Sequence, residues 1–227
     1  NFGESEFSAD HGAIRYGLSA IKSLGAPMIR AIVEERNENG KYQSLRDFIE
    51  RMSGRELNKR AIENLIKAGA LDQVAGNRRQ KLIVYAEIVD AVNQEKKNAM
   101  TGQMSLFDLI SDEEKEAYEI QMPKVEEYSK EELLSFEKEV LGVYISGHPL
   151  EKYEKMWQKN ISATTMDFAY QEELHGSRLF DGAEEIIGGM VEGITIKHTK
   201  NNKTMVFLTI EDLLGTVEVV VFPRPYE

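Results

Sequence analysis

The sequence contains no cysteine, and this absence removes two classes of protein at once. Without thiols the chain can form neither a disulfide framework nor a thiolate metal site. No apolar run approaches the length of a membrane span, and no charged-then-apolar leader opens the chain. We therefore expect a cytoplasmic protein with no membrane partner.

Residues that could carry out catalysis are also scarce. The four histidines have no acidic or histidine partner at ligand spacing, so His148 is interpreted as a structural or surface residue and not as a metal ligand. The chain has no Ser-His-Asp set and no phosphate-binding loop, and the acidic pair Glu211-Asp212 is typical of a turn at a strand end. The sequence therefore predicts no catalytic residue, no metal site and no cofactor in this chain.

The net charge of −11 argues against a protein that binds nucleic acid through its bulk charge, but the charge is distributed unevenly. Residues 106–139 carry twelve acidic residues against four lysines, which is typical of a solvated linker. Residues 1–94 carry fourteen bases and thirteen acids, and residues 55–81 carry seven bases and three acids. This local excess of positive charge indicates a phosphate-binding surface.

The 227 residues are enough for two modest domains, and changes in composition divide the chain further. No methionine opens the chain, so we expect it to begin within a longer protein. The predicted segments are the end of a preceding region (1–16), an all-α domain with two helical hairpins (17–97), an acidic linker (98–128), a helical connector (129–187) and the first strands of a small barrel (188–227). The predicted fold class is α+β and multidomain.

Two helical hairpins are predicted in residues 17–97, because apolar residues recur at helical spacing on both sides of two glycine-containing turns. In the first, we expect Gly25 to form a left-handed cap and Pro27 to open the next helix. In the second, an amphipathic helix ends at Gly69 and a long helix follows. Ile21-Lys22 and Ile66-Lys67 hold equivalent places before the two turns, which indicates a tandem helix-hairpin-helix module.

Such a turn exposes the unpaired N–H groups at the start of its second helix, where the helix dipole adds partial positive charge. A phosphate of duplex DNA can bind there without any reading of sequence. The predicted contact residues are Lys22, Ser23, Leu24, Gly25, Lys67, Ala68, Gly69, Ala70, Arg78, Arg79 and Lys81. The alternative is that both glycines only end helices of a bundle. Because Ser23 stands where such hairpins more commonly have their first glycine, we expect the first turn to be the weaker contact.

A short apolar peptide interrupts the acidic linker, formed by Gln103, Met104, Ser105, Leu106 and Phe107. Burying the leucine and the phenylalanine in a partner's groove would give roughly 1.5 to 3 kcal/mol each. The Gln103 amide, which both donates and accepts, would fix the register. The peptide resembles the internal sliding-clamp-binding motif of bacterial replicative DNA polymerases, with Met104 as a mild departure. The alternative is that it forms one face of a short helix packed on a neighbour.

Residues from 188 onward alternate with a period of two and predict three antiparallel strands. Met205 and Phe207 are expected on one face of the sheet, and Val206 and Leu208 on the other. This resembles the first three strands of an OB-fold, a barrel that binds single-stranded nucleic acid and needs two strands more than this chain contains. The residues that this resemblance implies for single-stranded DNA are Lys197, Lys200, Lys203 and Phe207. The alternative is a solvated basic hairpin tip with Phe207 in the core.

The order of these parts resembles the C-terminal region of bacterial DNA polymerase III alpha subunits, the replicative C-family polymerases. Residues 14–22 are similar to that family's passage from the fingers region (1–16) into the hairpin module. The Ser-Gly-His-Pro-Leu sequence at 146–150 and the Glu-Val-Val-Val-Phe-Pro sequence at 218–223 extend the resemblance.

This resemblance implies a non-catalytic portion of a DNA-directed DNA polymerase, a nucleotidyltransferase whose Mg²⁺-binding palm lies outside this chain. The implied partners are duplex DNA, single-stranded template, the sliding clamp ring and other replisome subunits. The chain alone is expected to be inactive. The alternatives are a clamp-tethered DNA-binding scaffold without a polymerase and the same region of an error-prone relative.

Overall fold

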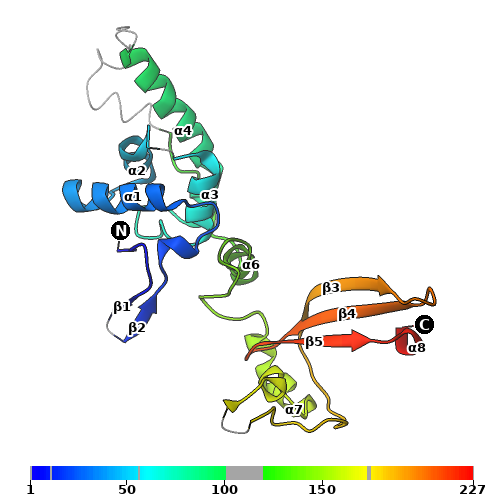
Figure 1. The fold of residues 1–227 in the computed structure, drawn as a ribbon. Helices are drawn as coiled ribbons and strands as arrows, with labels where there is room; N and C mark the ends of the chain where they lie inside the picture. The colour runs from blue at the N-terminus through cyan, green and yellow to red at the C-terminus, as the bar shows by residue number, and fades with distance from the viewer. Residues whose placement is uncertain (1, 11, 56, 101–119, 173–174, 227) are drawn as a thin grey trace. The chain divides into compact units, whose positions relative to one another are not determined.

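The computed structural model describes residues 2–10, 12–55, 57–100, 120–172 and 175–226. The chain divides into two compact units, Asn1–Ile145 and Ser146–Glu227, each treated by itself (Figure 1). Helices dominate the first unit and an antiparallel sheet the second, so the predicted α+β class is confirmed. Among the described residues, no helix is both long and apolar enough to cross a membrane.

The first unit opens with a two-stranded hairpin and continues as helices. Its elements are β1 (Ser8–Asp10), β2 (Ala13–Arg15), the 3-10 helix η1 (Leu18–Ala20), α1 (Ala26–Asn39), α2 (Leu45–Met52), α3 (Lys59–Lys67), α4 (Arg78–Met100) and α6 (Lys130–Leu141). The sequence does not predict the β1–β2 hairpin, because strands of three residues are too short to show an alternating pattern.

The core of this unit forms where α1, α2, α3 and α4 meet, with α4 packed against α2 and α3. The predicted apolar faces are confirmed: Leu45 and Phe48 of α2 and Ile62 and Ile66 of α3 are at most 1% exposed. Burying side chains of this size stabilises the fold by roughly 1.5 to 3 kcal/mol each. The core therefore holds both helical hairpins in one body.

Side chains cap four of these helices, among them α4, where Asn77 accepts the Gln80 N–H and the Gln80 side chain accepts the Asn77 N–H, both at 2.8 Å. The Ser44 hydroxyl accepts the Asp47 N–H at 3.0 Å, and Ser129 forms a reciprocal capping box with Glu132, both as their spacing predicts. Asn58 caps α3 in the same way. Each cap stabilises its helix by about 1 kcal/mol.

The helix α6 ends earlier than the sequence predicts. We expected it to stop at residues 147–149, but it ends at Leu141. Gly142 adopts a left-handed conformation with φ 79° and donates its N–H to the Lys138 carbonyl, which closes the helix. An earlier glycine thus ends the helix before Pro149 can act.

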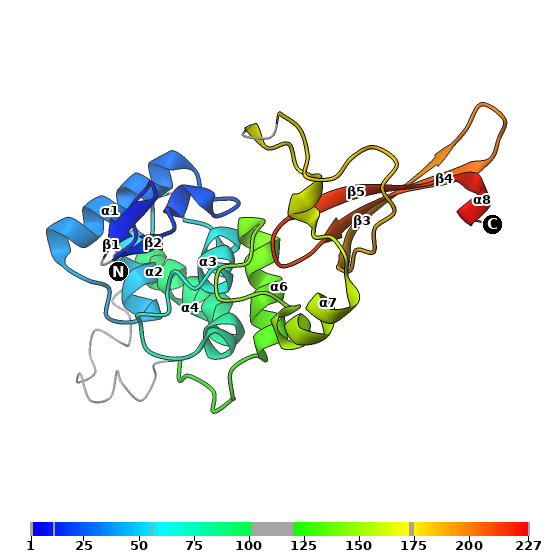
Figure 2. The same ribbon diagram turned by 90° about the horizontal axis from the view of Figure 1, so that it is seen from below.

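The helix α6 also belongs to the hairpin unit, whereas the sequence assigned it to a connector that began at residue 129. It packs alongside α3 (Figure 2). Leu134 and Val140 of α6 are at most 2% exposed, and the Lys22 N–H donates to the Val140 carbonyl at 2.9 Å. The unit boundary therefore falls after Ile145. The sequence did not predict this boundary, because contacts between distant segments leave no local pattern in the sequence.

The second unit contains a three-stranded antiparallel sheet in the order β3-β4-β5. Its elements are η3 (Glu151–Tyr153), α7 (Glu154–Asn160), η4 (Thr165–Phe168), β3 (Met190–His198), β4 (Thr204–Glu211), β5 (Thr216–Val221) and α8 (Pro223–Tyr226). Phe207 lies opposite Thr195, and Leu208 lies opposite Ile194. Because paired residues share a face, the predicted division of Phe207 from Leu208 is confirmed. The Leu208 face is partly open, since Ile194 is 64% exposed.

Two side chains tie the helical part of this unit to its sheet. Asp212 is 3% exposed and accepts the N–H and the hydroxyl of Thr165 at 2.8 and 2.7 Å. It also accepts the N–H groups of Leu214 and Gly215, so the Glu211-Asp212 pair forms a turn as predicted. The Trp157 indole N–H donates to the Gly188 carbonyl at 2.6 Å, consistent with its predicted anchoring of the connector.

A pair of fragments tests the placement of α6. The fragment of residues 1–145 should unfold cooperatively in urea, followed by the circular dichroism of its helices. The fragment of residues 1–128 should lose roughly 3 kcal/mol of unfolding free energy, because it lacks the buried Leu134 and Val140 of α6. Equal stability of the two fragments would show that α6 is only a connector.

Candidate nucleic-acid interface

The first turn, residues 21–25, joins η1 to α1 through a left-handed residue. Ser23 has φ 68°, whereas Gly25 is extended at φ −78° and ψ 151° and is the N-cap of α1. The prediction of a left-handed Gly25 is therefore wrong, because Ser23 makes the reversal. The predicted first helix is also only the 3-10 helix η1, since the Lys22 N–H donates to Val140 of α6.

The start of α1 leaves backbone donors open. The first helical hydrogen bond runs from the Ile29 N–H to the Gly25 carbonyl at 3.1 Å. Ahead of it lie the N–H groups of Ala26 and Met28, for which the described part of the chain provides no acceptor. Gly25 offers no capping side chain, and a Cβ placed there would contact only the Pro27 side chain, at 3.7 Å. The space beside Gly25 and the exposed Ala26 is therefore open, whereas Met28 is 5% exposed.

Lys22 carries a positive charge in the first turn, four residues before Ala26 in the sequence. Its ammonium donates to the backbone carbonyl of Glu139 at 2.6 Å, and a carbonyl does not cancel a charge. Among the described residues no carboxylate forms an ion pair with this lysine. The Lys22 carbonyl accepts the Asn64 side-chain amide at 2.7 Å, and the Lys22 N–H donates to Val140, so both backbone polar groups of Lys22 are bound.

The second turn keeps its predicted glycine but loses its predicted charge. Gly69 has φ 74°, and an added Cβ would overlap the Arg78 guanidinium, so only glycine fits. Lys67 forms ion pairs with Glu63 at 2.9 Å and with Glu139 at 3.0 Å. Burial alone would lower the pKa of Lys67, but these two carboxylates outweigh it and raise the pKa. Both carboxylates counter the charge that a phosphate would need.

Two of the three cations predicted near the start of α4 also bind other groups of the protein. The Arg78 guanidinium lies 2.7 Å from the Asp72 carboxylate, with only 12% of its side chain exposed. Lys81 is fully buried, and its ammonium donates to the Leu71 carbonyl at 2.9 Å. Burial lowers the pKa of Lys81. Arg79 remains exposed.

A carboxylate from the acidic segment occupies the start of α4. The two Glu127 oxygens accept the N–H groups of Arg78 at 2.8 Å and of Arg79 at 3.1 Å. Burial would raise the pKa of Glu127, but the N–H groups of Arg78, Tyr128 and Arg79 outweigh it, so its pKa lies below the ordinary value. The donors that a hairpin of this type was expected to present to phosphate are therefore already bound at the second turn.

Residues 123–127, which we call the strap, are held against α4 by two further bonds. Asn77 donates to the Val125 carbonyl at 3.0 Å, and Gln80 donates to the Pro123 carbonyl at 2.8 Å. The sequence pattern missed the strap because its acidic setting is typical of a solvated linker. No local signal pairs Glu127 with a helix that begins 49 residues earlier.

The remaining predicted residues of the two turns pack against the hydrophobic core. Leu24, Ala68 and Ala70 are half-buried against the hydrophobic core. Sequence reasoning also missed Asn64 and Glu139, which hold Lys22 and Lys67 respectively. Both lie on helices, and only the folded arrangement brings them to the turns.

In the second unit, two predicted residues of the single-strand site do meet. The Lys197 ammonium lies 4.5 Å from the centroid of the Phe207 ring, a cation–π contact. Lys200 and Lys203 are exposed in the turn between β3 and β4. The exposed lysines thus surround a half-buried aromatic ring, one face of which Lys197 covers.

The predicted docking peptide lies outside the described residues. Nothing is therefore said of the conformation of Gln103, Met104, Ser105, Leu106 and Phe107.

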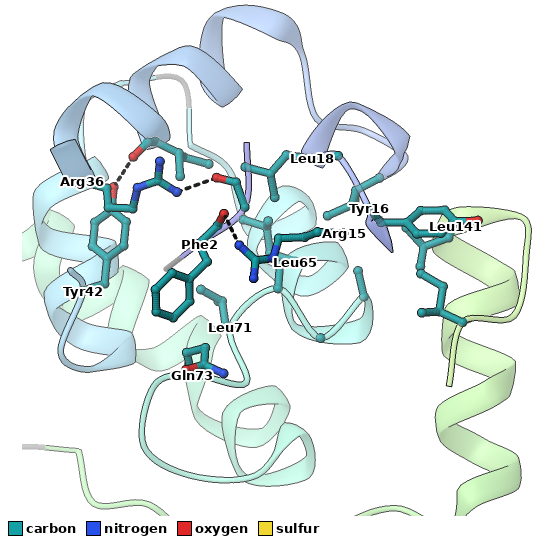
Figure 3. A pocket seen from close by; sticks show the side chains of 18 of the residues that line it. Phe2, Arg15, Tyr16, Leu18, Arg36, Tyr42, Leu65, Leu71, Gln73 and Leu141 are labelled. Carbon is teal, nitrogen blue, oxygen red and sulfur yellow. Dashed lines mark hydrogen bonds between the residues drawn. The ribbon is translucent and has the colours of Figure 1, made fainter. Parts of the chain in front are cut away.

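A cavity of about 420 Å³ lies between the first residues of the chain and the helical core (Figure 3). Its charged residues are used internally: Arg36 donates to the Gly3 carbonyl and pairs with Glu4, and Arg15 donates to the Phe2 carbonyl. Figure 3 shows the bond between Arg15 and Phe2 near apolar side chains such as Leu65. Nowhere in the described ranges do three or more metal-ligating side chains gather.

Paired turns with an open helix start define the helix-hairpin-helix class of DNA-binding domain, and a family model described as a helix-hairpin-helix motif matches residues 1–81. DNA polymerase III subunit alpha of Borreliella burgdorferi is 35% identical over 224 residues, covering 98% of this chain and 19% of that protein. The protein of the same name from Deinococcus radiodurans is 35% identical over 232 residues, covering 100% of this chain and 17% of the relative. DNA polymerase III subunit alpha of Thermus aquaticus is 34% identical over 216 residues, covering 94% of this chain and 16% of that protein.

This chain belongs to the DNA polymerase III alpha subunit family. It spans less than a fifth of the length of these curated relatives. Their shared name does not favour the alternative of a scaffold without a polymerase.

The Glu127 contact makes stability depend on pH. Because its pKa is lowered by folding, the ionised carboxylate stabilises the protein above the ordinary carboxyl range, and this contribution is lost as the pH falls through the lowered pKa. Glu127→Gln should therefore cost about 1 kcal/mol at neutral pH and almost nothing in strong acid. Urea unfolding at several pH values, followed by helical circular dichroism, measures this difference. The neighbouring exposed carboxylate provides the control, because Glu126→Gln should change little at any pH. A pH-independent cost for Glu127→Gln would contradict the assignment.

Proposed function

We propose that this chain holds a replicative DNA polymerase on duplex DNA by binding backbone phosphates at its first helix-hairpin-helix turn. The observation that carries the proposal is the open start of α1, where the Ala26 and Met28 N–H groups lack an acceptor in the described part of the chain. Unpaired donors, the helix dipole and the charge of Lys22 together favour an anion. Phosphate contacts fix position without reading sequence, as a polymerase that copies any template requires.

The second turn has a supporting part in this proposal. Glu127 occupies the start of α4, and Lys67, Arg78 and Lys81 are engaged within the protein. The exposed Arg79 adds long-range attraction for DNA. We therefore expect the first turn to be the stronger contact, which reverses the order that the sequence predicted.

The polymerase reaction itself is proposed for a part of the protein beyond this chain. The relatives are polymerase subunits by name, and this chain covers less than a fifth of them. Nucleotide transfer and its Mg²⁺ ions would belong to the remainder. This chain would contribute binding and no chemistry.

Two further contacts complete the proposal. Residues 103–107 would dock on the sliding clamp, and the Lys197–Phe207 face, with Lys200 and Lys203 beside it, would meet single-stranded template. A base can stack on Phe207 only after Lys197 leaves the ring or from the ring's other face. Several weak contacts on one chain would raise the overall affinity through avidity.

Placing a carboxylate at the first turn tests the phosphate site. Gly25→Asp should weaken duplex binding about tenfold, because its carboxylate would take the open N–H groups and repel phosphate. Stability should hold or rise, since aspartate is a favoured N-cap in this extended conformation. Fluorescence anisotropy with a labelled duplex measures the affinity, and urea unfolding measures the stability.

The control for this experiment has the same shape without the charge. Gly25→Asn should weaken binding less than Gly25→Asp, and Lys67→Ala at the second turn should leave it nearly unchanged. Wild-type affinity in Gly25→Asp would rule out the first turn as the phosphate site.

The docking peptide is tested by removing its two large side chains. Leu106→Ala with Phe107→Ala should abolish binding to the sliding clamp, because most of the buried apolar area is lost, while duplex affinity stays within about twofold. Leu109→Ala with Ile110→Ala removes similar side chains outside the motif and should leave clamp binding intact. Titration of the clamp distinguishes docking from the helix-face alternative, in which both pairs matter equally.

A further inference from the structure

The backbone of Lys22 is fixed on both sides of its Cα by elements distant in sequence. Its N–H donates to the Val140 carbonyl of α6 at 2.9 Å, and its carbonyl accepts the Asn64 side-chain amide of α3 at 2.7 Å. Asn64 is 8% exposed on a helix face that otherwise buries apolar side chains. An isolated buried amide is costly, and this hydrogen bond offsets the cost.

The residue after this peptide is held in an unfavourable conformation. Ser23 has φ 68°, a region that a residue with a Cβ adopts only when its surroundings impose it. The hydrogen-bonded backbone of Lys22 precedes Ser23, and α1 begins after Leu24 and Gly25. The direction of the first turn of α1 therefore depends on where the backbone of Lys22 is held.

We propose that Asn64 is a positioning residue for the phosphate-binding turn: its amide keeps Ser23 in the left-handed conformation and so aims the open N–H groups of α1 at the DNA backbone. Asn64 itself does not touch the DNA. The inference rests on the proposed function of the first turn and adds the residue that sets its geometry.

The chain offers a matched control. Tyr42 is 4% exposed, and its hydroxyl donates to the Ile32 carbonyl at 2.8 Å, so Tyr42→Phe removes one buried hydrogen bond to a backbone carbonyl, as Asn64→Leu does. Ile32 lies in the body of α1, away from the turn. Both variants should lose stability, but only Asn64→Leu should lose DNA binding.

The strain at Ser23 supplies a rescue. Glycine adopts positive φ without a Cβ penalty, so Ser23→Gly should restore the turn when the Asn64 bond is absent. A role of Asn64 in folding alone would predict a gain in stability from Ser23→Gly with no return of DNA affinity.

The experiment compares the wild-type chain with Asn64→Leu, Tyr42→Phe and the Asn64→Leu, Ser23→Gly double variant. Duplex affinity is measured by anisotropy over a range of salt concentrations, well below every unfolding midpoint. Asn64→Leu should bind about tenfold more weakly with a salt slope smaller by about one, as expected for one lost phosphate contact. Tyr42→Phe should stay within about twofold, and the double variant should recover most of the loss.

The inference is overturned if Asn64→Leu binds DNA like the wild type, loses no more than Tyr42→Phe, or gains nothing from Ser23→Gly. Should Asn64→Leu fail to fold, Asn64→Ala is held to the same criteria. Failure here is distinct from failure of the proposed function. If Gly25→Asp weakens binding and Asn64→Leu does not, only the role of Asn64 falls; if Gly25→Asp binds normally, the first turn itself is not the site.

Discussion

The fixed position of the Lys22 backbone is the constraint on which the helical unit depends. Because Val140 takes its N–H and Asn64 binds its carbonyl, the chain cannot continue η1 as an α-helix through this point. It must reverse at Ser23 and start α1 in a new direction. The same bonds make α6 part of the hairpin unit. The two backbone groups of Lys22 thus connect α3 and α6 to the turn before α1, the helix start that we assign to DNA.

The two turns look alike in sequence and differ in electrostatics. At the second turn, Glu139 pairs with Lys67 and Glu127 binds the start of α4, so both its charge and its donors are satisfied within the protein. At the first turn, the only partner of the Lys22 ammonium among the described residues is the Glu139 carbonyl, and the same residues offer no acceptor to the Ala26 and Met28 N–H groups. The acidic segment is therefore more than a solvated linker, since Glu127 folds back on the start of α4 at the second turn.

The features that the sequence predicted correctly are those with a local cause. The N-cap at Ser44 and the capping box at Ser129 depend on residues three apart, and the division of Phe207 from Leu208 follows from the alternation along a strand. The end of α3 near Gly69 was predicted because a complete amphipathic pattern precedes it.

The features that the sequence did not predict depend on distant partners. Gly25 was expected to be left-handed, but the anchoring of Lys22 moves the reversal to Ser23. The pairing of Lys67 with Glu139 joins residues 72 apart, so no local pattern predicts it. The docking peptide, the incomplete barrel and the polymerase reaction remain predictions from resemblance.

The central claim is that the first turn, and not the second, binds phosphate. Its most direct test is a titration of the isotopically labelled chain with a short DNA duplex, followed by the NMR signals of individual backbone amides. The account predicts that the Ala26 and Met28 amides shift as DNA is added, while the Arg78 and Arg79 amides, which are bound to Glu127, do not. Shifts at Arg78 and Arg79 with unchanged Ala26 and Met28 would contradict it.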